Sequence, residues 1–356
     1  MENKFHKHFQ LNGKSFDTVD EIFEFTSNIS TEIYTFLQDW FSDKPTIAVQ
    51  TSGSTGTPKS IELQKKHMIN SAFATAHYFD LPPKTTALLC LPITYIAGKM
   101  MLIRSINLGW HLDIVESTLH PLKKITKSYD FSAMVPLQLE NSLDKIEGIK
   151  KIIVGGGVVS RLLQEKLQKV DCQAYTTYGM TETISHIAVK KLNHVHKYPN
   201  FYEVLPNVTI YKDERNCLVI KAKNIADNVL FTNDIVQLIS TKKFDWLGRF
   251  DNVINSGGIK LHPEMIEDKL AEVVENRFFV AGIHDDQLGE KLILLIESLV
   301  KIENVTLKKT ELFYKIKSLK TLSKFEIPKE IYFIKSFTET ISGKLQRKST
   351  LEKLGF

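Results

Sequence analysis

The chain has 356 residues, enough for about two domains and a sizeable hydrophobic core. It is 43% hydrophobic and 24% charged, as in ordinary soluble globular proteins, and no apolar run approaches the roughly 18 residues needed to span a membrane. The N-terminus lacks the apolar core of a signal peptide, and Cys90, Cys172 and Cys217 match neither a metal site nor a disulfide framework. We therefore expect a cytoplasmic protein with no membrane partner.

The net charge of +5 is unevenly distributed. Residues 301–356 contain thirteen Lys and Arg against six Asp and Glu, whereas the first 300 residues contain 33 against 35. A basic end of this kind can face nucleic acid or a polyphosphate, but a solvated lysine-rich surface explains it equally well. Aromatic residues are not interleaved there as base stacking requires, so we expect no nucleic-acid partner.

Strand-like and helix-like patterns alternate along the first half of the chain. Strands are expected at 46–51, 85–92, 111–116, 131–136, 150–157 and 173–179. Helices are expected at 65–79 and 97–109, at 160–170 with Ser160 as the cap, and as a basic helix between residues 116 and 131. Alternation of this kind predicts a parallel sheet with helices covering its faces.

The pattern changes twice in the second half. Residues 208–247 consist of strands and turns, which indicates an antiparallel or barrel-like section. Further on, helices are expected at 263–275 and 308–319, and strands at 278–284, 290–297 and 330–335. The sequence thus predicts an α/β protein in two domains. Residues 1–248 would form a large domain with mainly parallel sheet layers and a small barrel-like β section, and residues 249–356 a small α+β domain.

Residues 50–60, QTSGSTGTPKS, follow the first expected strand. Such a run is either a surface loop or a phosphate cradle made of backbone N–H groups, hydroxyls and one ammonium. Gly53, Lys59 and Ser60 have the spacing of a Walker A motif, but Pro58 replaces its second glycine. Proline has no N–H to offer a phosphate, so a P-loop NTPase is disfavoured.

Four further stretches are unusually polar or glycine-rich: YGMTET at 178–183, TND at 232–234, the segment 248–270, and TISGKLQRK at 340–348. The first places a threonine and a glutamate directly after an expected strand, where open α/β sheets bind ligands. Each stretch taken alone is equally consistent with an ordinary turn. Together and in this order they carry more information than any one of them.

Together with residues 50–60, these stretches resemble the signatures of the acyl-adenylate-forming superfamily. It contains the acyl-CoA synthetases, the adenylation domains of peptide synthetases, and luciferase, and the resemblance runs from about residue 46 to the C-terminus. It implies that a carboxylic acid is activated by ATP as an acyl adenylate, with release of pyrophosphate, and is then transferred to a thiol. The cofactors implied are ATP and Mg²⁺, with coenzyme A as co-substrate.

The resemblance also assigns ATP-binding residues. The loop would hold the phosphates, three glycines and the YG pair would form walls for adenine and for the acid, and a carboxylate with a nearby arginine would bind the ribose. In that order, the residues are Thr51, Ser52, Gly53, Ser54, Thr55, Gly56, Thr57 and Lys59; Gly155, Gly156, Gly157, Tyr178 and Gly179; Asp234 and Arg249.

The resemblance assigns four residues to catalysis and a fifth to the hinge about which the small domain rotates. By resemblance, Thr181 would contact the phosphate that is attacked, and Glu182 would help to hold the metal. Lys344 would reach the site during adenylation, and Lys260 would face it after the small domain has rotated about Asp251. The C-terminal domain is therefore expected to be mobile, because two half-reactions with different nucleophiles need two arrangements of one site.

The sequence departs from the family pattern in four places. Family members usually have on the order of a hundred or more residues before the glycine/threonine loop, so we expect much of the N-terminal subdomain to be missing. Asn233 replaces a usual glycine, Thr338 stands where a proline often precedes the lysine loop, and Tyr95 replaces a frequent histidine. None of these changes removes a predicted catalytic group, although the missing part often flanks the acid pocket.

Within the superfamily, the segments IIVGGGVVS, YGMTETISHIAV and LPITYIAGKMMLIRSI look most like those of o-succinylbenzoate–CoA ligases of menaquinone synthesis. Such an acid is an aromatic dicarboxylate, and its second carboxylate needs a cation or hydrogen-bond donors. The candidates are Tyr95, Lys99, Arg104, Ser185 and His186. The alternative is that the two cations lie on a helix surface without touching a substrate and that the histidine is structural.

Two other functions remain open at this stage. An adenylation enzyme that loads another acid onto coenzyme A or onto a carrier-protein thiol would share every motif. A nucleic-acid-binding protein would require all five motifs to be coincidental. Whether the chain forms a homodimer is also left open.

Overall fold

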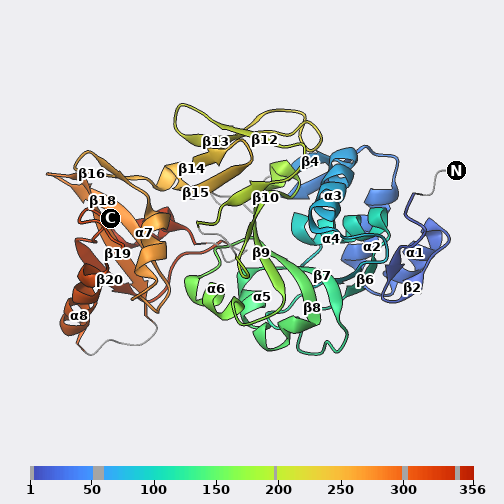
Figure 1. Ribbon diagram of the computed structural model, residues 1–356, viewed down its shortest axis with the longest axis horizontal. Coiled ribbons are helices and arrows are strands. Elements are labelled where there is room, and N and C mark those ends of the chain that lie inside the picture. The colour runs from blue at the N-terminus through green and yellow to red at the C-terminus, as the bar shows by residue number, and fades with distance from the viewer. Residues whose placement is uncertain (1–3, 51–59, 196–198, 299–303, 341–344) are drawn as a thin grey trace.

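The computed structural model describes residues 4–50, 60–195, 199–298, 304–340 and 345–356. Figure 1 shows a large N-terminal lobe and a small C-terminal lobe, with the C-terminal end of the chain in the small lobe. Both lobes combine helices and strands, which confirms the predicted fold class.

A single sheet of 13 strands runs through the large lobe. Its strands are β1 (Gln10–Leu11), β2 (Lys14–Ser15), β5 (Thr86–Leu89), β6 (His111–Ile114), β7 (Tyr129–Met134), β8 (Ile149–Val154), β9 (Gln173–Gly179), β10 (His186–Lys191), β11 (Tyr202–Val204), β12 (Thr209–Lys212), β13 (Cys217–Lys221), β14 (Leu230–Ser240) and β15 (Lys243–Arg249). Their order in the sheet is β12-β13-β14-β15-β11-β10-β9-β8-β7-β5-β6-β1-β2. The pairs from β9 to β1 are parallel, and those from β9 to β12 are antiparallel. The predicted β section therefore continues the parallel sheet.

The helices of the large lobe include α1 (Val19–Ser27), α2 (Thr31–Phe41), α3 (Lys65–Phe79), α4 (Ile96–Leu108), α5 (Pro136–Glu140), the 3₁₀ helix η1 (Leu143–Gly148) and α6 (Arg161–Leu167). Local signals predicted α3, α4 and α6, whereas α1, α2, α5 and η1 were not predicted. Ser160 caps α6 by accepting a hydrogen bond from the N–H of Leu163 at 3.1 Å. Gly109 ends α4 with a left-handed φ of 71°.

The predicted basic helix between residues 116 and 131 is wrong. Residues 121–124 form a turn instead, and the segment on either side of it has no helix. Pro121 begins this turn. A proline has no N–H to donate and disfavours helical dihedral angles at the preceding residue, so no helix can run through His120 into this turn.

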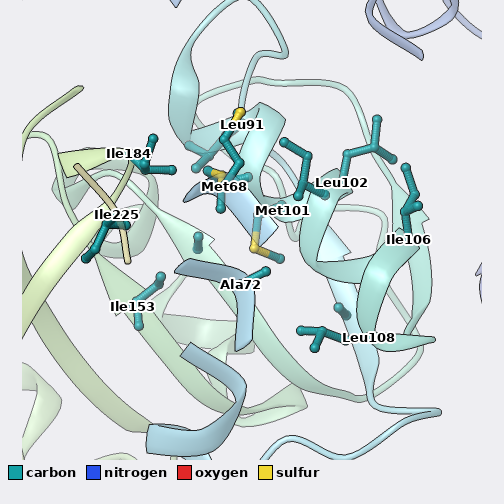
Figure 2. Close-up of a cluster of buried hydrophobic side chains, with 14 of the residues drawn as sticks. Met68, Ala72, Leu91, Met101, Leu102, Ile106, Leu108, Ile153, Ile184 and Ile225 are labelled. Carbon is teal, nitrogen blue, oxygen red and sulfur yellow. The ribbon is translucent and has the colours of Figure 1, made fainter. Parts of the chain in front are cut away.

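The main core of the large lobe lies between the sheet and helices α3 and α4. Met68 and Ala72 of α3 and Met101 of α4 are completely buried. Figure 2 shows that Ile184, from the turn between β9 and β10, lies in the same cluster. Burying a side chain of this size stabilises the fold by about 1.5–3 kcal/mol, so the turn is anchored by its own isoleucine.

The small lobe has its own sheet and its own core. Its elements are η3 (Phe250–Asn252), β16 (Ile254–Ser256), β17 (Ile259–Leu261), α7 (Pro263–Leu270), β18 (Phe278–Asp285), β19 (Gly289–Glu297), α8 (Val305–Ser318), β20 (Glu330–Ile334) and α9 (Arg347–Leu354). The strand order is β17-β16-β19-β18, and β20 pairs in parallel with β19. A cluster that includes Ile266, Val280 and Leu294 fills the space between this sheet and its helices.

Two general expectations can be compared with the structure. Within the described ranges, no helix is both long enough and apolar enough to cross a lipid bilayer. All three cysteines are free thiols buried inside the protein.

Candidate active site

Two predicted segments of the site fall outside the described residues. They are Lys344 and the loop residues Thr51, Ser52, Gly53, Ser54, Thr55, Gly56, Thr57 and Lys59. The structure does describe the strands on either side of the loop. β3 (Thr46–Gln50) and β4 (Ser60–Gln64) pair in an antiparallel manner, with Gln50 opposite Ser60. The loop therefore begins and ends at neighbouring residues of one strand pair.

Three predicted nucleotide-binding residues meet across the antiparallel part of the sheet. The hydroxyl of Tyr178 donates to Oδ2 of Asp234 at 2.7 Å, and Nη1 of Arg249 lies 3.8 Å from Oδ1. Trp246, which sequence reasoning missed, donates from Nε1 to the same Oδ1 at 3.1 Å. Burial, reinforced by the charge of Asp234, raises the pKa of Tyr178 well above its usual value, so its hydroxyl keeps its proton and remains a donor.

The predicted glycine walls lie at the carboxyl ends of neighbouring parallel strands. Gly155, Gly156 and Gly157 directly follow β8, and Gly179 ends β9. A Cβ atom at Gly179 would lie 2.2 Å from the carbonyl oxygen of Ser185. Only glycine therefore allows β9 to pass so close to the start of β10.

The turn between β9 and β10 contains the 3₁₀ helix η2 (Thr181–Thr183). Glu182 is exposed, and among the described residues its carboxylate has no hydrogen-bond or ion-pair partner. Ile184 has φ 66° and ψ −54°, which is a rare conformation for a β-branched residue. The N–H of Ser185 donates to the carbonyl of Thr183 at 2.7 Å across this residue. The tight turn thus fixes Thr181, Glu182 and Ser185 relative to one another.

Arg104 of α4 is a buried cation. Its Nη2 donates to Oγ of Ser185 at 2.9 Å, and its Nε donates to Oγ1 of Thr75 at 3.3 Å, a residue of α3 that sequence reasoning missed. In the described parts of the chain no carboxylate forms an ion pair with it, and the side chain is only 2% exposed. Burial lowers its pKa to about 9, so the guanidinium still carries its charge at neutral pH.

The other candidates for acid binding occupy different positions. Nδ1 of His186 lies 3.1 Å from the serine hydroxyl that Arg104 contacts. Burial, followed by the charge of Arg104, lowers the pKa of His186 to about 3, so its ring is neutral. Tyr95 is the half-buried residue directly before α4. The ammonium of Lys99 instead lies over the ring of Phe36, 4.8 Å from the ring centroid.

Lys260 of β17 lies between the two lobes. It lines a cavity of about 410 Å³ together with Arg215, Phe250 and His262. Neither member of the pair Thr181–Glu182 lines this cavity. The cavity that Lys260 lines therefore does not include these two residues, and the role of Lys260 after a rotation stays a prediction.

The predicted hinge residue Asp251 lies in η3, directly after β15, where the chain enters the small lobe. Gly248 at the end of β15 has φ 139°, and a Cβ atom there would lie 2.3 Å from Oε2 of Glu264 in α7. Arg161 of α6 and Glu272, which follows α7, form a further ion pair between the lobes. The two lobes therefore contact each other both at the junction and across a surface ion pair.

With the site described, the chain can be compared with known proteins. The family model described as "AMP-binding enzyme" matches residues 33–219, just over half of the chain. The chain belongs to this family of AMP-binding enzymes. A solved acyl-CoA synthetase (AMP-forming)/AMP-acid ligase II-like protein from Dyadobacter fermentans is 37% identical, with a TM-score of 0.59, and the match covers 91% of this chain and 93% of that one.

Two further relatives carry a more specific name. The 2-succinylbenzoate–CoA ligase of Staphylococcus epidermidis is 28% identical in an alignment of 331 positions that covers 84% of this chain and 68% of the relative. The o-succinylbenzoate CoA synthetase of Bacillus subtilis, solved with its acyl-adenylate intermediate, is 20% identical with a TM-score of 0.71, and the match covers 85% of this chain and 68% of that one. The latter likeness shows a shared fold.

These findings confirm the class of enzyme that the motifs imply. The AMP-binding enzyme is an AMP-forming ligase of the acyl-CoA synthetase type, and ATP and a carboxylic acid are its small-molecule substrates. The family match ends before Asp234, Arg249 and Lys260, so the roles of these residues rest on the sequence motifs and on the geometry described above.

Proposed function

We propose that this AMP-binding enzyme is an o-succinylbenzoate–CoA ligase that acts in menaquinone synthesis. In the first half-reaction, a carboxylate oxygen of the acid attacks the α-phosphorus of ATP, and pyrophosphate leaves with the electrons of the broken P–O bond. In the second, the sulfur of coenzyme A attacks the acyl carbon, and AMP leaves. The names of relatives such as the 2-succinylbenzoate–CoA ligase of Staphylococcus epidermidis support the acid proposed.

The observation that carries the choice of acid is the unpaired charge of Arg104. A buried charge is strongly unfavourable unless it is paired, and this guanidinium has only hydroxyl and thioether partners within the described residues. Arginine is suited to binding a carboxylate through two parallel hydrogen bonds. In our proposal, the carboxylate that is not activated reaches Arg104 beside Ser185, which is partly exposed.

The nucleotide side fits the same reaction. Asp234 accepts two hydrogen bonds, one on each oxygen, and an ionised carboxylate has about four acceptor sites, so capacity for ribose hydroxyls remains. Mg²⁺ usually binds one or two carboxylates together with substrate phosphates, and the exposed, unpartnered Glu182 suits that role. The metal would offset the repulsion between the acid and the triphosphate.

Two lysines complete the proposal. Lys344 would stabilise charge on the transferring phosphorus during adenylation, where one such group typically contributes about 10²–10³ in rate. Lys260 would act during thioester formation, after the small lobe has moved about Asp251. Both assignments rest on the motif resemblance. Lys344→Ala should therefore lower acyl-adenylate formation while sparing thiolysis of supplied adenylate.

The proposal is tested with a panel of acids, ATP, Mg²⁺ and coenzyme A, with pyrophosphate release recorded and products identified by mass. We expect 2-succinylbenzoyl-CoA with o-succinylbenzoate and little turnover with monocarboxylic benzoates. Turnover of a different acid would overturn the choice of substrate. Formation of adenylate without thioester would instead favour the alternative in which a carrier-protein thiol accepts the acyl group.

Variants of two cations on one helix sharpen the test. Arg104→Met should lower kcat/KM for o-succinylbenzoate by about 10²-fold, because the proposed ion pair between Arg104 and the carboxylate that is not activated is lost. The same change at Lys99 should cost no more than about threefold, because its ammonium lies over the ring of Phe36 and makes only a weak cation–π contact. Equal losses in the two variants would show that Arg104 does not select the acid.

Two other expectations stay predictions. The cytoplasmic location rests on the three buried free thiols, which suit a reducing compartment. A homodimer can be examined by measuring the mass of the protein in solution.

A further inference from the structure

Asn233 of β14 joins two parts of the molecule that are distant in sequence. Its Oδ1 accepts a hydrogen bond from Nη1 of Arg215 at 2.9 Å. Its Nδ2 donates to Oδ2 of the hinge residue Asp251 at 3.2 Å.

The arginine on one side of this bridge is held firmly. Arg215 lies in the turn between β12 and β13, and its Nε and Nη2 donate to Oδ2 of Asp213 at 2.9 and 2.8 Å. Nη2 also donates to the carbonyl of Thr232 at 3.1 Å. Its guanidinium lies 5.3 Å from the ring centroid of Phe250, the first residue of η3. Arg215 therefore contacts the junction between the lobes directly as well as through Asn233.

The carboxylate on the other side connects the bridge to the nucleotide residues. Oδ2 of Asp251 also accepts from Nη2 of Arg249 at 3.3 Å, and Nη1 of Arg249 lies 3.8 Å from Asp234. Polar contacts thus run without interruption from Arg215 through Asn233 to the predicted ribose carboxylate.

An amide suits both ends of this bridge. Its oxygen accepts from the guanidinium of Arg215 while its NH₂ group donates to the carboxylate of Asp251. Aspartate at 233 would bring two carboxylates together, and glycine would leave no bridge. The same junction borders the cavity in which Lys260 lies.

We propose that Asn233 is a positioning residue that, with Arg215, clamps Asp251 to the large lobe. The clamp favours the present lobe arrangement, in which Lys260 lines a cavity that includes neither Thr181 nor Glu182, over the arrangement that thioester formation needs. This inference rests on the two half-reactions of the proposed function. Asn233 thereby sets the balance between adenylation and thiol transfer.

The first test measures the half-reactions separately in Asn233→Gly. Pyrophosphate release is followed with o-succinylbenzoate and ATP, and thioester formation with supplied 2-succinylbenzoyl adenylate and coenzyme A. The ratio of thiol transfer to adenylation should rise by about threefold to tenfold, the range expected when one or two exposed hydrogen bonds are lost. An unchanged ratio, or equal losses in both steps, would overturn the inference.

Matched variants separate the clamp from general effects. Asn207, an exposed asparagine with φ 62°, tolerates glycine without strain, so Asn207→Gly should leave the ratio unchanged. Asn233→Asp should raise the ratio at least as much as glycine, because its charge repels Asp251. Arg215→Met should act in the same direction, and the double variant with Asn233→Gly should exceed neither single variant by much. Fully additive effects would show that the two residues act independently.

A distance measurement tests the clamp without any substrate. Spin labels on cysteines introduced at the exposed positions Lys150 and Lys320, one on each lobe, report the arrangement of the lobes, because the three natural cysteines are buried. Asn233→Gly should broaden or shift the distance distribution, and an unchanged distribution would contradict the clamp. If the parent activates no aromatic dicarboxylate, the proposed function fails, whereas this measurement still decides the clamp.

Discussion

Among the described residues, Arg347 of the small lobe and Arg104 of the large lobe are both largely buried. They differ in whether a carboxylate of the chain pairs with them. In the small lobe, Arg347 of α9 donates from Nη2 to Glu267 at 2.8 Å, and a second bond from Nη1 makes the pair bidentate. Glu264 lies 3.8 Å away as a further carboxylate. In the large lobe, Arg104 has no such partner in the described residues.

The pKa directions express the same difference. Burial is the largest single influence on the pKa of Arg347 and lowers it, but the charge of Glu267, its hydrogen bond and the charge of Glu264 together raise the pKa by more, so the net shift is upward. Burial acts without opposition on Arg104, and its pKa falls to about 9. Arg347 is neutralised inside the chain and connects α9 to α7, whereas Arg104 is not neutralised within the described residues and is the residue that we propose binds a carboxylate of the substrate.

The largest effect on stability is expected for Arg347, which forms a complete ion pair with Glu267. Arg347→Met should lower the free energy of unfolding of the small lobe by about 3–5 kcal/mol, because the buried Glu267 is left without its cation. Hydrogen exchange of β18 and β19 in the full chain measures this loss. Addition of Glu267→Gln should recover a large part of it. A loss below about 1 kcal/mol would mean that the two arginines differ less than their contacts suggest.

The second effect concerns Arg104→Met. No carboxylate is stranded, so the free energy of unfolding without ligand should change by no more than about 1 kcal/mol. At a concentration of o-succinylbenzoate 100 times the parent's Kd, the parent should gain about 2.7 kcal/mol, and a variant that binds about 100-fold more weakly should gain only about 0.4 kcal/mol. Thermal melting with and without the acid records both quantities. A strongly destabilised variant that still responds to the acid would make Arg104 a structural residue like Arg347.

The third effect is a pH dependence of stability caused by His186, which contacts the same serine hydroxyl as Arg104. The pKa of His186 falls from its ordinary 6.5 to about 3 in the fold. The unfolded chain therefore takes up the proton first, and stability should fall by about 1.4 kcal/mol per pH unit below 6.5, until the pH approaches 3. His186→Gln should remove this contribution, which unfolding curves at pH 7 and 5.5 can measure. Identical slopes in parent and variant would show that the ring is protonated in the fold.

The smallest effect is expected from the ion pair between the lobes. The side chains of Arg161 and Glu272 are 48% and 27% exposed, and such pairs contribute about 0–1 kcal/mol. Reversing both charges should restore what either single reversal loses, and the coupling should weaken at high salt. A coupling energy between Arg161 and Glu272 larger than the effects of the buried groups would contradict the expected ranking from Arg347 down to this surface pair.

Local signals in the sequence predicted the elements that depend on neighbouring residues. Ser160 begins α6 and Gly109 ends α4 through contacts within one turn, so a short sequence window contains the information. The continuation of the parallel sheet into the antiparallel part depends on pairings such as Tyr202 with Phe244, which are 42 residues apart. No local pattern specifies such a pairing. The helix wrongly predicted between residues 116 and 131 is a different case. There, Pro121 is a local signal against a continuous helix, and the prediction gave it too little weight.

The site was predicted unevenly for a similar reason. Motif residues such as Tyr178 and Asp234 do meet, whereas Trp246 and Thr75 belong to no motif and were missed. Lys99 and Arg104 are separated by five residues, about 140° around a helix, so they face different directions. The sequence alone gives no way to decide which of two cations on a mostly buried helix faces the turn after β9.

The tight turn at Ile184 has a consequence for the energetics of turnover. Thr181 and Ser185, proposed to bind phosphate and acid respectively, are four residues apart on a segment whose dihedral angles are set by hydrogen bonds and by a buried isoleucine. Their separation is thus settled when the chain folds, and little orientational entropy is left to lose each time the two substrates meet. Well-oriented groups of this kind reach effective molarities of about 10⁵–10⁸ M. A variant that loosens this turn would bind each substrate nearly as before and yet bring them together far less often.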